Sequence, residues 1–282
     1  MHQPLAADYT PSTAPGAGTA VFLHGLGGWT HNWAALIDLL RGSVHCLALD
    51  LPGYGRSAPP AEGVVTVEGQ AAAVAAHLDR TGHGRVHLVG NSLGGLTALH
   101  LAAHRPELVA SLTLLAPVLP ALPPPRAALA ALLALPGAPR LYGRLLAGRS
   151  PERQLDDLYR LIYADPCRVR PDQRATEARE RLRRSALPHA PRMLPEGMRA
   201  VVRASLHRGV SSPWQQAGRI TAPTLLVYGR EDRLVPFRLA RRAYAAFRDA
   251  RLLTLPDTGH VAMQERPAPV AGALRALIAE AG

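Results

Sequence analysis

The sequence of 282 residues predicts an α/β protein: a mostly parallel, doubly wound sheet with an inserted all-helical segment. Short apolar runs that fit buried strands alternate with helix-periodic segments over residues 20–117, and the alternation resumes at residue 224. Such alternation is typical of a parallel sheet with helices on both faces. From residue 118 to about 210 there is no strand pattern, only helix-like pieces separated by prolines. The expected organisation is a core domain of residues 1–117 and 213–282 and a helical cap of residues 118–212.

Six segments have the pattern of buried strands, with continuous apolar residues bounded by turn-forming residues. A parallel strand that is buried on both faces has this continuous pattern rather than an alternating one. The expected strands are residues 20–23, 44–50, 85–90, 111–116, 224–228 and 251–255. Residues 1–18 are rich in proline, alanine and glycine, and we expect a loose arm there.

Helices are expected between the strands wherever apolar residues recur at intervals of three and four. Trp33, Leu36 and Leu40 share one helical face, and Thr66 is a favourable N-cap for the next helix. The expected core helices are residues 32–40, 66–80, the segment after Ser92 up to His104, 239–247 and 267–280. The expected cap helices are residues 126–135, 141–147, 151–163, 173–185 and 193–207.

The segment Gly90-Asn91-Ser92-Leu93-Gly94 joins an expected strand to an expected helix and fits the pattern G-x-S-x-G. A serine in this context sits on a sharp, strained turn, which leaves no space for side chains at the flanking glycines. The helix that follows directs its free backbone N–H groups toward any anion that forms beside the serine. We therefore expect Ser92 to be a nucleophile; the alternative is an ordinary Gly-Ser turn.

Two further polar residues stand just past strand ends. Asp232 follows the strand 224–228, and His260 follows the strand 251–255. In open α/β sheets the carboxyl ends of the strands form the site, and the chain order Ser, Asp, His is that of α/β-hydrolases. Singly, an aspartate after a strand is a common turn former and a lone histidine is more often structural. The combination predicts a catalytic triad, with Glu231 as the alternative acid.

The expected roles in the predicted triad follow from the weak nucleophilicity of a hydroxyl group. Serine is a weak nucleophile unless a base within hydrogen-bond reach takes its proton, and His260 is the expected base. Asp232 is expected to hold His260 in the required tautomer and to stabilise its charged form. The oxyanion needs two donors, and we expect the backbone N–H groups of Leu26 and Leu93.

In these motifs the chain resembles α/β-hydrolases that carry a helical cap, and most nearly carboxylesterase-like and meta-cleavage-product hydrolase-like proteins. The matching segments are residues 24–28, 50–57, 90–95, 229–236 and 259–267. The resemblance covers the core, and the cap contains no motif of this kind. The residues expected to bind substrate beside the triad are Gly25, Gly27, Asn32, Asn91 and Val261.

The chain departs from this family pattern at two places. Only 19 residues precede Ala20, where the family usually has a β-hairpin, so we expect reduced or missing edge strands. Carbon–carbon hydrolases of the meta-cleavage type usually carry tryptophan after the catalytic histidine, and here Val261 follows it. Arg179 matches their cap arginine only loosely. Ser92 argues against relatives that use an aspartate nucleophile, such as haloalkane dehalogenases.

The expected function is hydrolysis of a small-molecule carboxylic ester with a small-to-medium hydrophobic acyl group. The same triad is compatible with carbon–carbon bond cleavage of a dienone acid, thioester hydrolysis or perhydrolysis. A non-catalytic binding protein on the same scaffold is the third class. No cofactor or metal is expected, because the 12 histidines have no ligand spacing and the glycine loop lacks the Lys-Ser/Thr of a phosphate loop.

The composition excludes several other classes. The net charge is +11, and all 32 basic residues are arginine. Residues 119–210 contain 17 Arg against 8 Asp and Glu. These arginines lie among acids and prolines without the aromatics of a single-strand binder, so no nucleic-acid partner is expected. No apolar run reaches 18 residues, and no signal peptide is recognisable, so no membrane span is expected. The two cysteines fit a reducing cytoplasm, and nothing indicates an oligomeric state.

Overall fold

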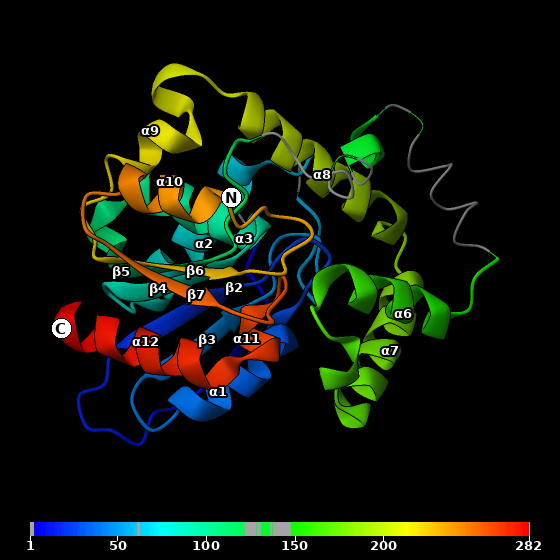
Figure 1. Ribbon diagram of the computed structural model, residues 1–282, viewed down its shortest axis with the longest axis horizontal. Coiled ribbons are helices and arrows are strands. Elements are labelled where there is room, and N and C mark those ends of the chain that lie inside the picture. The colour runs from blue at the N-terminus through cyan, green and yellow to red at the C-terminus, as the bar shows by residue number, and fades with distance from the viewer. Residues whose placement is uncertain are drawn as a thin grey trace.

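The computed structural model describes residues 3–60, 63–121, 128, 131–135, 137 and 148–281. Its centre is one seven-stranded sheet with the order β1-β3-β2-β4-β5-β6-β7 (Figure 1). The strands are β1 (Ala7–Thr10), β2 (Thr19–Leu23), β3 (His45–Leu49), β4 (Val86–Asn91), β5 (Val109–Leu115), β6 (Thr224–Gly229) and β7 (Ala250–Leu255). Only the pairing of β1 with β3 is antiparallel, which confirms the predicted mostly parallel sheet.

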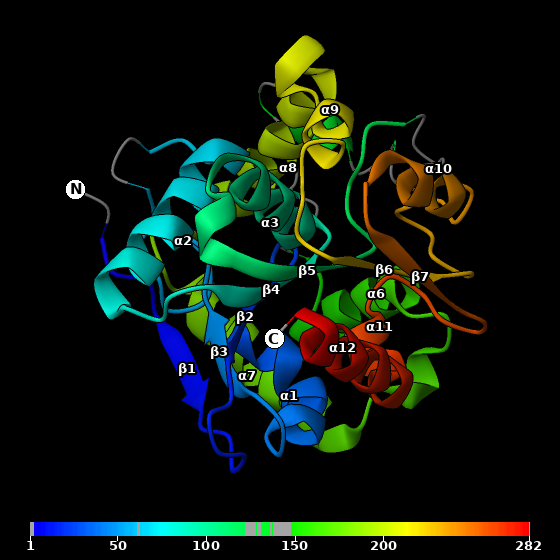
Figure 2. The ribbon, with the colours of Figure 1, turned by 90° about the vertical axis from the view of Figure 1, so that its left-hand side faces the viewer.

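Helices cover both faces of the sheet, as the doubly wound prediction requires (Figure 2). One face carries α2 (Val67–Thr81), α3 (Leu93–His104), α9 (Pro213–Ala217) and α10 (Leu239–Ala246). The other carries α1 (Ala34–Leu40), α11 (Ala262–Glu265) and α12 (Pro267–Ala281). Among the described residues, no helix has both the length and the apolar composition that crossing a bilayer requires.

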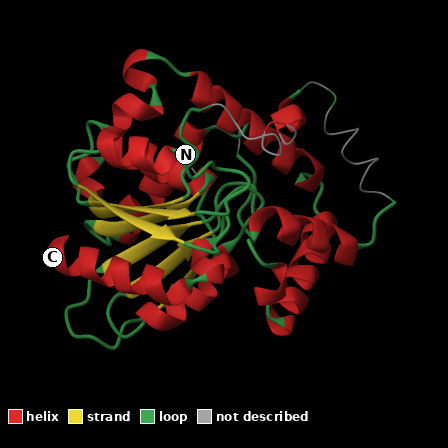
Figure 3. Cartoon of the chain, in the orientation of Figure 1, coloured by secondary structure: helices red, strands yellow, loops and turns green. Residues whose placement is uncertain are grey.

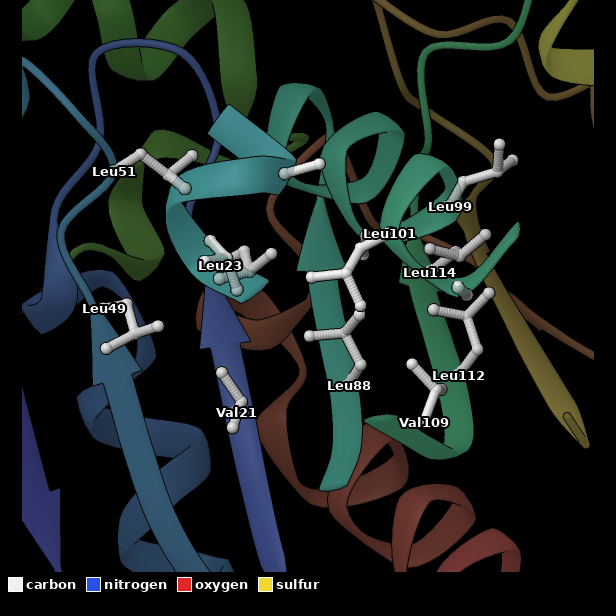
Figure 4. Close-up of a cluster of buried hydrophobic side chains, with 14 of the residues drawn as sticks. Val21, Leu23, Leu49, Leu51, Leu88, Leu99, Leu101, Val109, Leu112 and Leu114 are labelled. Atoms are coloured by element: carbon white, nitrogen blue, oxygen red, sulfur yellow. The ribbon is translucent and has the colours of Figure 1, made fainter. Parts of the chain in front are cut away.

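Two apolar layers hold these helices on the sheet. Every residue of β4 and of β6 is buried, because a central parallel strand is covered on both of its faces. Figure 4 shows the layer beneath α3, where Leu88 of β4 and Leu112 of β5 belong to one buried cluster with Leu99 and Leu101 of the helix. The second layer packs β2, β4 and β6 against α1 and α12.

The described part of the insertion between β5 and β6 consists mainly of three helices. They are α6 (Pro151–Ile162), α7 (Pro171–Ser185) and α8 (Ala190–Leu206). They stand beyond the carboxyl ends of the strands, across the loops that follow those strands (Figures 1 and 3). The expected helices at residues 126–135 and 141–147 lie largely outside the described residues, apart from the 3₁₀ turn Leu132–Ala134. The remaining 3₁₀ turns are Thr30–Trp33, Pro106–Leu108, Pro166–Arg168 and Gly209–Ser211.

The N-terminal segment is more ordered than its composition indicates. Where a loose arm was expected, β1 pairs with β3 from Ala7 opposite Leu49 to Thr10 opposite Cys46. The strand has only four residues and neither an alternating nor a continuous apolar pattern, so the sequence does not indicate it. It is recognised only in the structure, where it pairs with the edge of β3. This short strand is the reduced sheet edge that the family pattern led us to expect. The helices α9 and α11 were also missed, because four or five residues are too few to show a helical period.

We predict opposite effects on stability for alanine at two glycines. A Cβ at Gly94 would collide with the carbonyl oxygens of Leu23 and His24, whereas a Cβ at Gly272 in α12 would meet nothing within 4 Å. Gly94→Ala should lower the free energy of unfolding by about 1–3 kcal/mol. Gly272→Ala should raise the free energy of unfolding by about 0.5–1 kcal/mol, because alanine lowers the conformational entropy of the unfolded chain and favours the helix. Urea denaturation measures both, and a Gly94→Ala protein as stable as the wild type would contradict the packing described.

Candidate active site

Ser92 occupies a strained turn between β4 and α3. Its φ of 56° and ψ of −115° are unusual for a residue other than glycine, and it is the N-cap of α3. Two backbone hydrogen bonds hold it there: its own N–H donates to Leu115 O (3.0 Å), and Leu96 N–H donates to Ser92 O (3.0 Å). The turn lies at the edge of the sheet where β4 ends, and Ser92 is 8% exposed there.

The glycine loop after β2 passes directly beside this turn. A Cβ on Gly25 would lie 3.2 Å from Ser92 Cβ and 3.0 Å from Asn91 Oδ1. The N–H of Gly28 donates to Gly25 O (3.0 Å), which closes a tight turn around Leu26. Leu93 is the first residue of α3, so its N–H has no partner within the helix. Both predicted oxyanion donors therefore belong to backbone segments next to Ser92.

Asp232 and His260 come from the loops after β6 and β7, and their side chains meet. His260 Nδ1 lies 2.8 Å from Asp232 Oδ2, and the side chains are 6% and 0% exposed. The other carboxylate oxygen, Oδ1, accepts the N–H groups of Leu234 (2.8 Å) and Val235 (2.9 Å). With a proton on Nδ1, the ring donates to Asp232 and keeps Nε2 available to accept one. The alternative acid, Glu231, has an exposed position, and its backbone N–H donates to Thr258 O (2.9 Å).

This arrangement has the parts of an acyl-transfer site: a serine on a strained turn, a histidine oriented by a carboxylate, and nearby backbone donors. Within the described ranges, no three His, Cys, Asp or Glu side chains come together in a way that could hold a metal ion.

Comparison with known proteins identifies the family. Residues 20–267 match the model of the α/β-hydrolase fold family. The chain belongs to this family. The matched range spans the sheet from β2 to β7 and includes the insertion.

Three relatives illustrate what the hydrolase is similar to. It is 30% identical to the dihydrolipoyllysine-residue acetyltransferase component of the acetoin cleaving system of Cupriavidus necator, covering 89% of this chain but only 61% of that protein. It is 30% identical to a predicted carbamate hydrolase, RutD, of Pseudomonas syringae pv. syringae, over 93% of this chain and 94% of the relative. It is also 30% identical to the 2-hydroxy-6-oxo-6-phenylhexa-2,4-dienoate hydrolase of Comamonas testosteroni, over 89% of this chain and 84% of the relative.

The two asparagines that were expected to bind substrate make structural hydrogen bonds in the hydrolase. The Nδ2 of the buried Asn91 donates to Leu115 O and to His260 O, both at 3.1 Å. Oδ1 of Asn32 accepts the N–H of Trp29 (2.8 Å). These contacts give both amides a part in shaping the loops, and contact of either one with substrate stays a prediction.

Of the other three expected substrate-binding residues, Gly25 lies beside Ser92, while Gly27 and Val261 lie in the loops after β2 and β7. Gly27 has a φ of 73°, and a Cβ there would lie 4.0 Å from Leu194 Cδ1 of α8. Val261 is 5% exposed and packs in the apolar layer with Met263. A small aliphatic side chain therefore stands where carbon–carbon hydrolases of this family usually have tryptophan.

His24 supports the glycine loop, a role that the sequence analysis missed. Its Nδ1–H donates to Gly25 O (2.8 Å), and its Nε2 accepts the N–H of Leu51 (3.0 Å). Burial lowers the pKa of His24 to about 4, so the ring is neutral at neutral pH and can fill both roles. The only sequence signal was its place directly before the glycine loop.

Arg184 of α7 connects the insertion to the same loop. Its Nη1 donates to Gly27 O (2.8 Å) and Gly28 O (3.3 Å), and Nε lies 3.3 Å from Glu180 Oε1. Burial lowers the pKa of its guanidinium below the usual range for arginine. No spacing distinguishes Arg184 from the other arginines of the insertion, so only the structure identifies it. Arg179, which matches the cap arginine of the carbon–carbon hydrolases only loosely, makes a hydrogen bond to Thr176 on its own helix.

We predict that His24 makes stability depend on pH. Its pKa is about 4 when folded against 6.5 as the reference value, so the unfolded chain binds the extra proton. The stabilisation is therefore complete above about pH 6.5 and is lost as the pH falls toward 4, by up to about 3 kcal/mol. His24→Gln, which can also donate to Gly25 O and accept from Leu51 N, should flatten the curve of unfolding free energy against pH in this window.

The exposed His31 provides the control, and His31→Gln should leave the curve unchanged. Urea titrations between pH 4 and 7 measure the difference. Equal slopes for the wild type and His24→Gln would show that burial of His24 does not contribute.

Proposed function

We propose that this hydrolase is a carboxylesterase that cleaves a small-to-medium hydrophobic acyl ester through Ser92, His260 and Asp232. The observation that carries the proposal is the buried hydrogen bond between His260 and Asp232, at the sheet edge where Ser92 occupies its strained turn. A buried carboxylate that holds a histidine near a nucleophilic hydroxyl is the arrangement that activates serine.

The mechanism follows from these three side chains. Ser92 Oγ attacks the ester carbonyl while Nε2 of His260 takes its proton. Asp232 holds Nδ1–H, which keeps Nε2 free for this task and stabilises the charged ring. His260 then protonates the departing alcohol and leaves an acyl group on Ser92. A water molecule, deprotonated by the same Nε2, releases the acid and restores the serine.

The negative charge that develops on the carbonyl oxygen needs donors placed in advance. We assign this role to the backbone N–H groups of Leu26 and Leu93, which flank Ser92. One such donor typically lowers the barrier by ~3 kcal/mol. The support that His24 and Arg184 give to the glycine loop would keep the Leu26 donor in place before substrate binds.

An apolar cluster beside these donors supports a hydrophobic acyl group. Leu26, Leu93 and Leu96 pack with Val201 and Ala204 of α8. Gly197 of the same helix lies against Leu26 and Tyr54, where any side chain would collide with both. We propose that residues 118–212 act as the cap and that α8 limits the size of the acyl group.

Carbon–carbon bond hydrolysis of a dienone acid is the second candidate. Arg184 favours it, because a partly buried guanidinium beside the glycine loop could attract a substrate carboxylate. The relative named as a phenylhexadienoate hydrolase is consistent with that chemistry. Two features favour ester hydrolysis over carbon–carbon cleavage. Val261 stands in place of tryptophan, and Arg184 is already hydrogen-bonded to two carbonyl groups of the glycine loop.

The triad is tested with p-nitrophenyl esters. Ser92→Ala should abolish turnover and fluorophosphonate labelling without loss of folding. Asp232→Asn should lower kcat on the order of 10⁴-fold, because His260 would lose the partner that sets its tautomer. Glu231→Gln is the matched control on the neighbouring exposed acid and should retain activity. Full activity in Ser92→Ala would refute the proposal. A large loss of kcat in Glu231→Gln but not in Asp232→Asn would identify Glu231 as the acid of the triad.

The substrate class is tested by comparing esters of increasing acyl length with an acidic dienone. For the proposed esterase, kcat/KM should peak at a short or medium chain and exceed that for the dienone. Val201→Ala, which removes volume from the apolar cluster, should shift the peak to longer chains. A dienone turned over much faster than every ester, with a KM that rises in Arg184→Gln, would instead establish the second candidate.

A further inference from the structure

The loop that carries His260 rests on the end of helix α6, which belongs to the insertion. The backbone N–H of His260 donates to Ile162 O (2.7 Å). Gly259 fits so closely that a Cβ there would lie 2.6 Å from Ile162 O and 2.7 Å from Ala164 N. The backbone position of His260 therefore depends on a segment about 100 residues earlier in the chain.

A single buried carboxylate joins the two segments. Glu265 Oε1 accepts the N–H of Gly259 (2.7 Å), and Oε2 accepts the N–H of Ala164 (2.9 Å). The Glu265 side chain is fully buried, and its nearest cation, Arg168, lies 3.7 Å from Oε2. A buried carboxylate needs such charge-assisted hydrogen bonds to offset its desolvation. Both oxygens are thus committed to holding the His260 loop against the insertion.

The same end of α6 also contacts the loop of Asp232. The guanidinium of Arg233 donates to Tyr163 O (2.9 Å) and to Arg160 O. A cation at the carbonyl end of a helix is favourable, because the last carbonyl groups have no partners within the helix. Both loops of the His260–Asp232 pair are consequently held by one turn of the insertion.

We propose that Glu265 is a positioning residue that couples the insertion to catalysis by setting the place of His260. The inference rests on the proposed function, because it requires His260 to be the base. Glu265 does not reach the reacting atoms; it acts through the backbone of Gly259 and His260. Displacement of a base by about 1 Å can cost on the order of 10²-fold in rate.

The test is Glu265→Gln, assayed with the best p-nitrophenyl ester. The amide keeps one acceptor but presents a donor to the other backbone N–H, so one half of the bridge breaks. We expect kcat per active site, titrated with a fluorophosphonate, to fall on the order of 10²-fold while KM stays within about twofold. The acid limb of the kcat/KM profile against pH should also shift, because that limb reports the ionisation of the free enzyme's base.

Glu177→Gln is the matched control. Glu177 accepts hydrogen bonds from Tyr159 and Gln173, so its contacts join α6 to α7 within the insertion. This variant should keep the wild-type kcat and pH profile. Glu265→Gln with kcat within twofold of wild type per titrated site and an unmoved pH profile would overturn the proposal, even if the protein melts at a lower temperature. An equal loss of kcat in Glu177→Gln would overturn it too.

The outcomes separate this inference from the proposed function. If Ser92→Ala keeps full activity, the proposed triad fails, whatever Glu265→Gln does. If Ser92→Ala is inactive and Glu265→Gln is fully active, only the positioning role fails. Should Glu265→Gln not fold, Glu265→Asp tests the same bridge, because the shorter carboxylate keeps its charge but cannot reach the N–H groups of both Gly259 and Ala164. A folded Glu265→Asp should lose at least tenfold in kcat, and wild-type kcat would refute the proposal.

Discussion

The strained turn at Ser92 is the constraint on which the site depends. A residue with a side chain keeps a positive φ only where its surroundings leave no alternative, and here β4, β5 and α3 enclose the turn. The enclosure requires close contact between backbones, and Gly94 allows α3 to lie against the carbonyl groups of Leu23 and His24. That contact also brings the glycine loop beside Ser92. One packing requirement thus places both the candidate nucleophile and the segment that carries the proposed Leu26 donor.

The insertion is a structural part of the candidate site. At one side, Arg184 holds the carbonyl groups of the glycine loop. At the other, the end of α6 receives the backbone of His260 and the guanidinium of Arg233. The core supplies the candidate catalytic side chains, while the insertion fixes the loops that carry them. A shift of these helices would therefore alter the geometry of the candidate site.

Buried carboxylates do much of this work through backbone N–H groups. Asp232 accepts two such groups and His260, and Glu265 accepts one from each side of the bridge. Asp50, also fully buried, accepts the N–H groups of Thr30 and Arg56 and thereby shapes the two loops near His24. Charge-assisted hydrogen bonds of this kind are strong and directional, so they hold loops that have no regular structure of their own.

The sequence by itself determined the α/β class, the places of six strands and the candidate residues Ser92, Asp232 and His260. It could do so because these features have local signals: continuous apolar runs, helical periods, and polar residues just past strand ends. The tertiary structure alone decided the edge strand β1, the choice of Asp232 over Glu231 as the partner of His260, and the contacts of Arg184 and Glu265. Those outcomes depend on pairing between segments 28 to 157 residues apart in the chain. No local pattern encodes such contacts, because they exist only once the sheet has brought its loops to one edge.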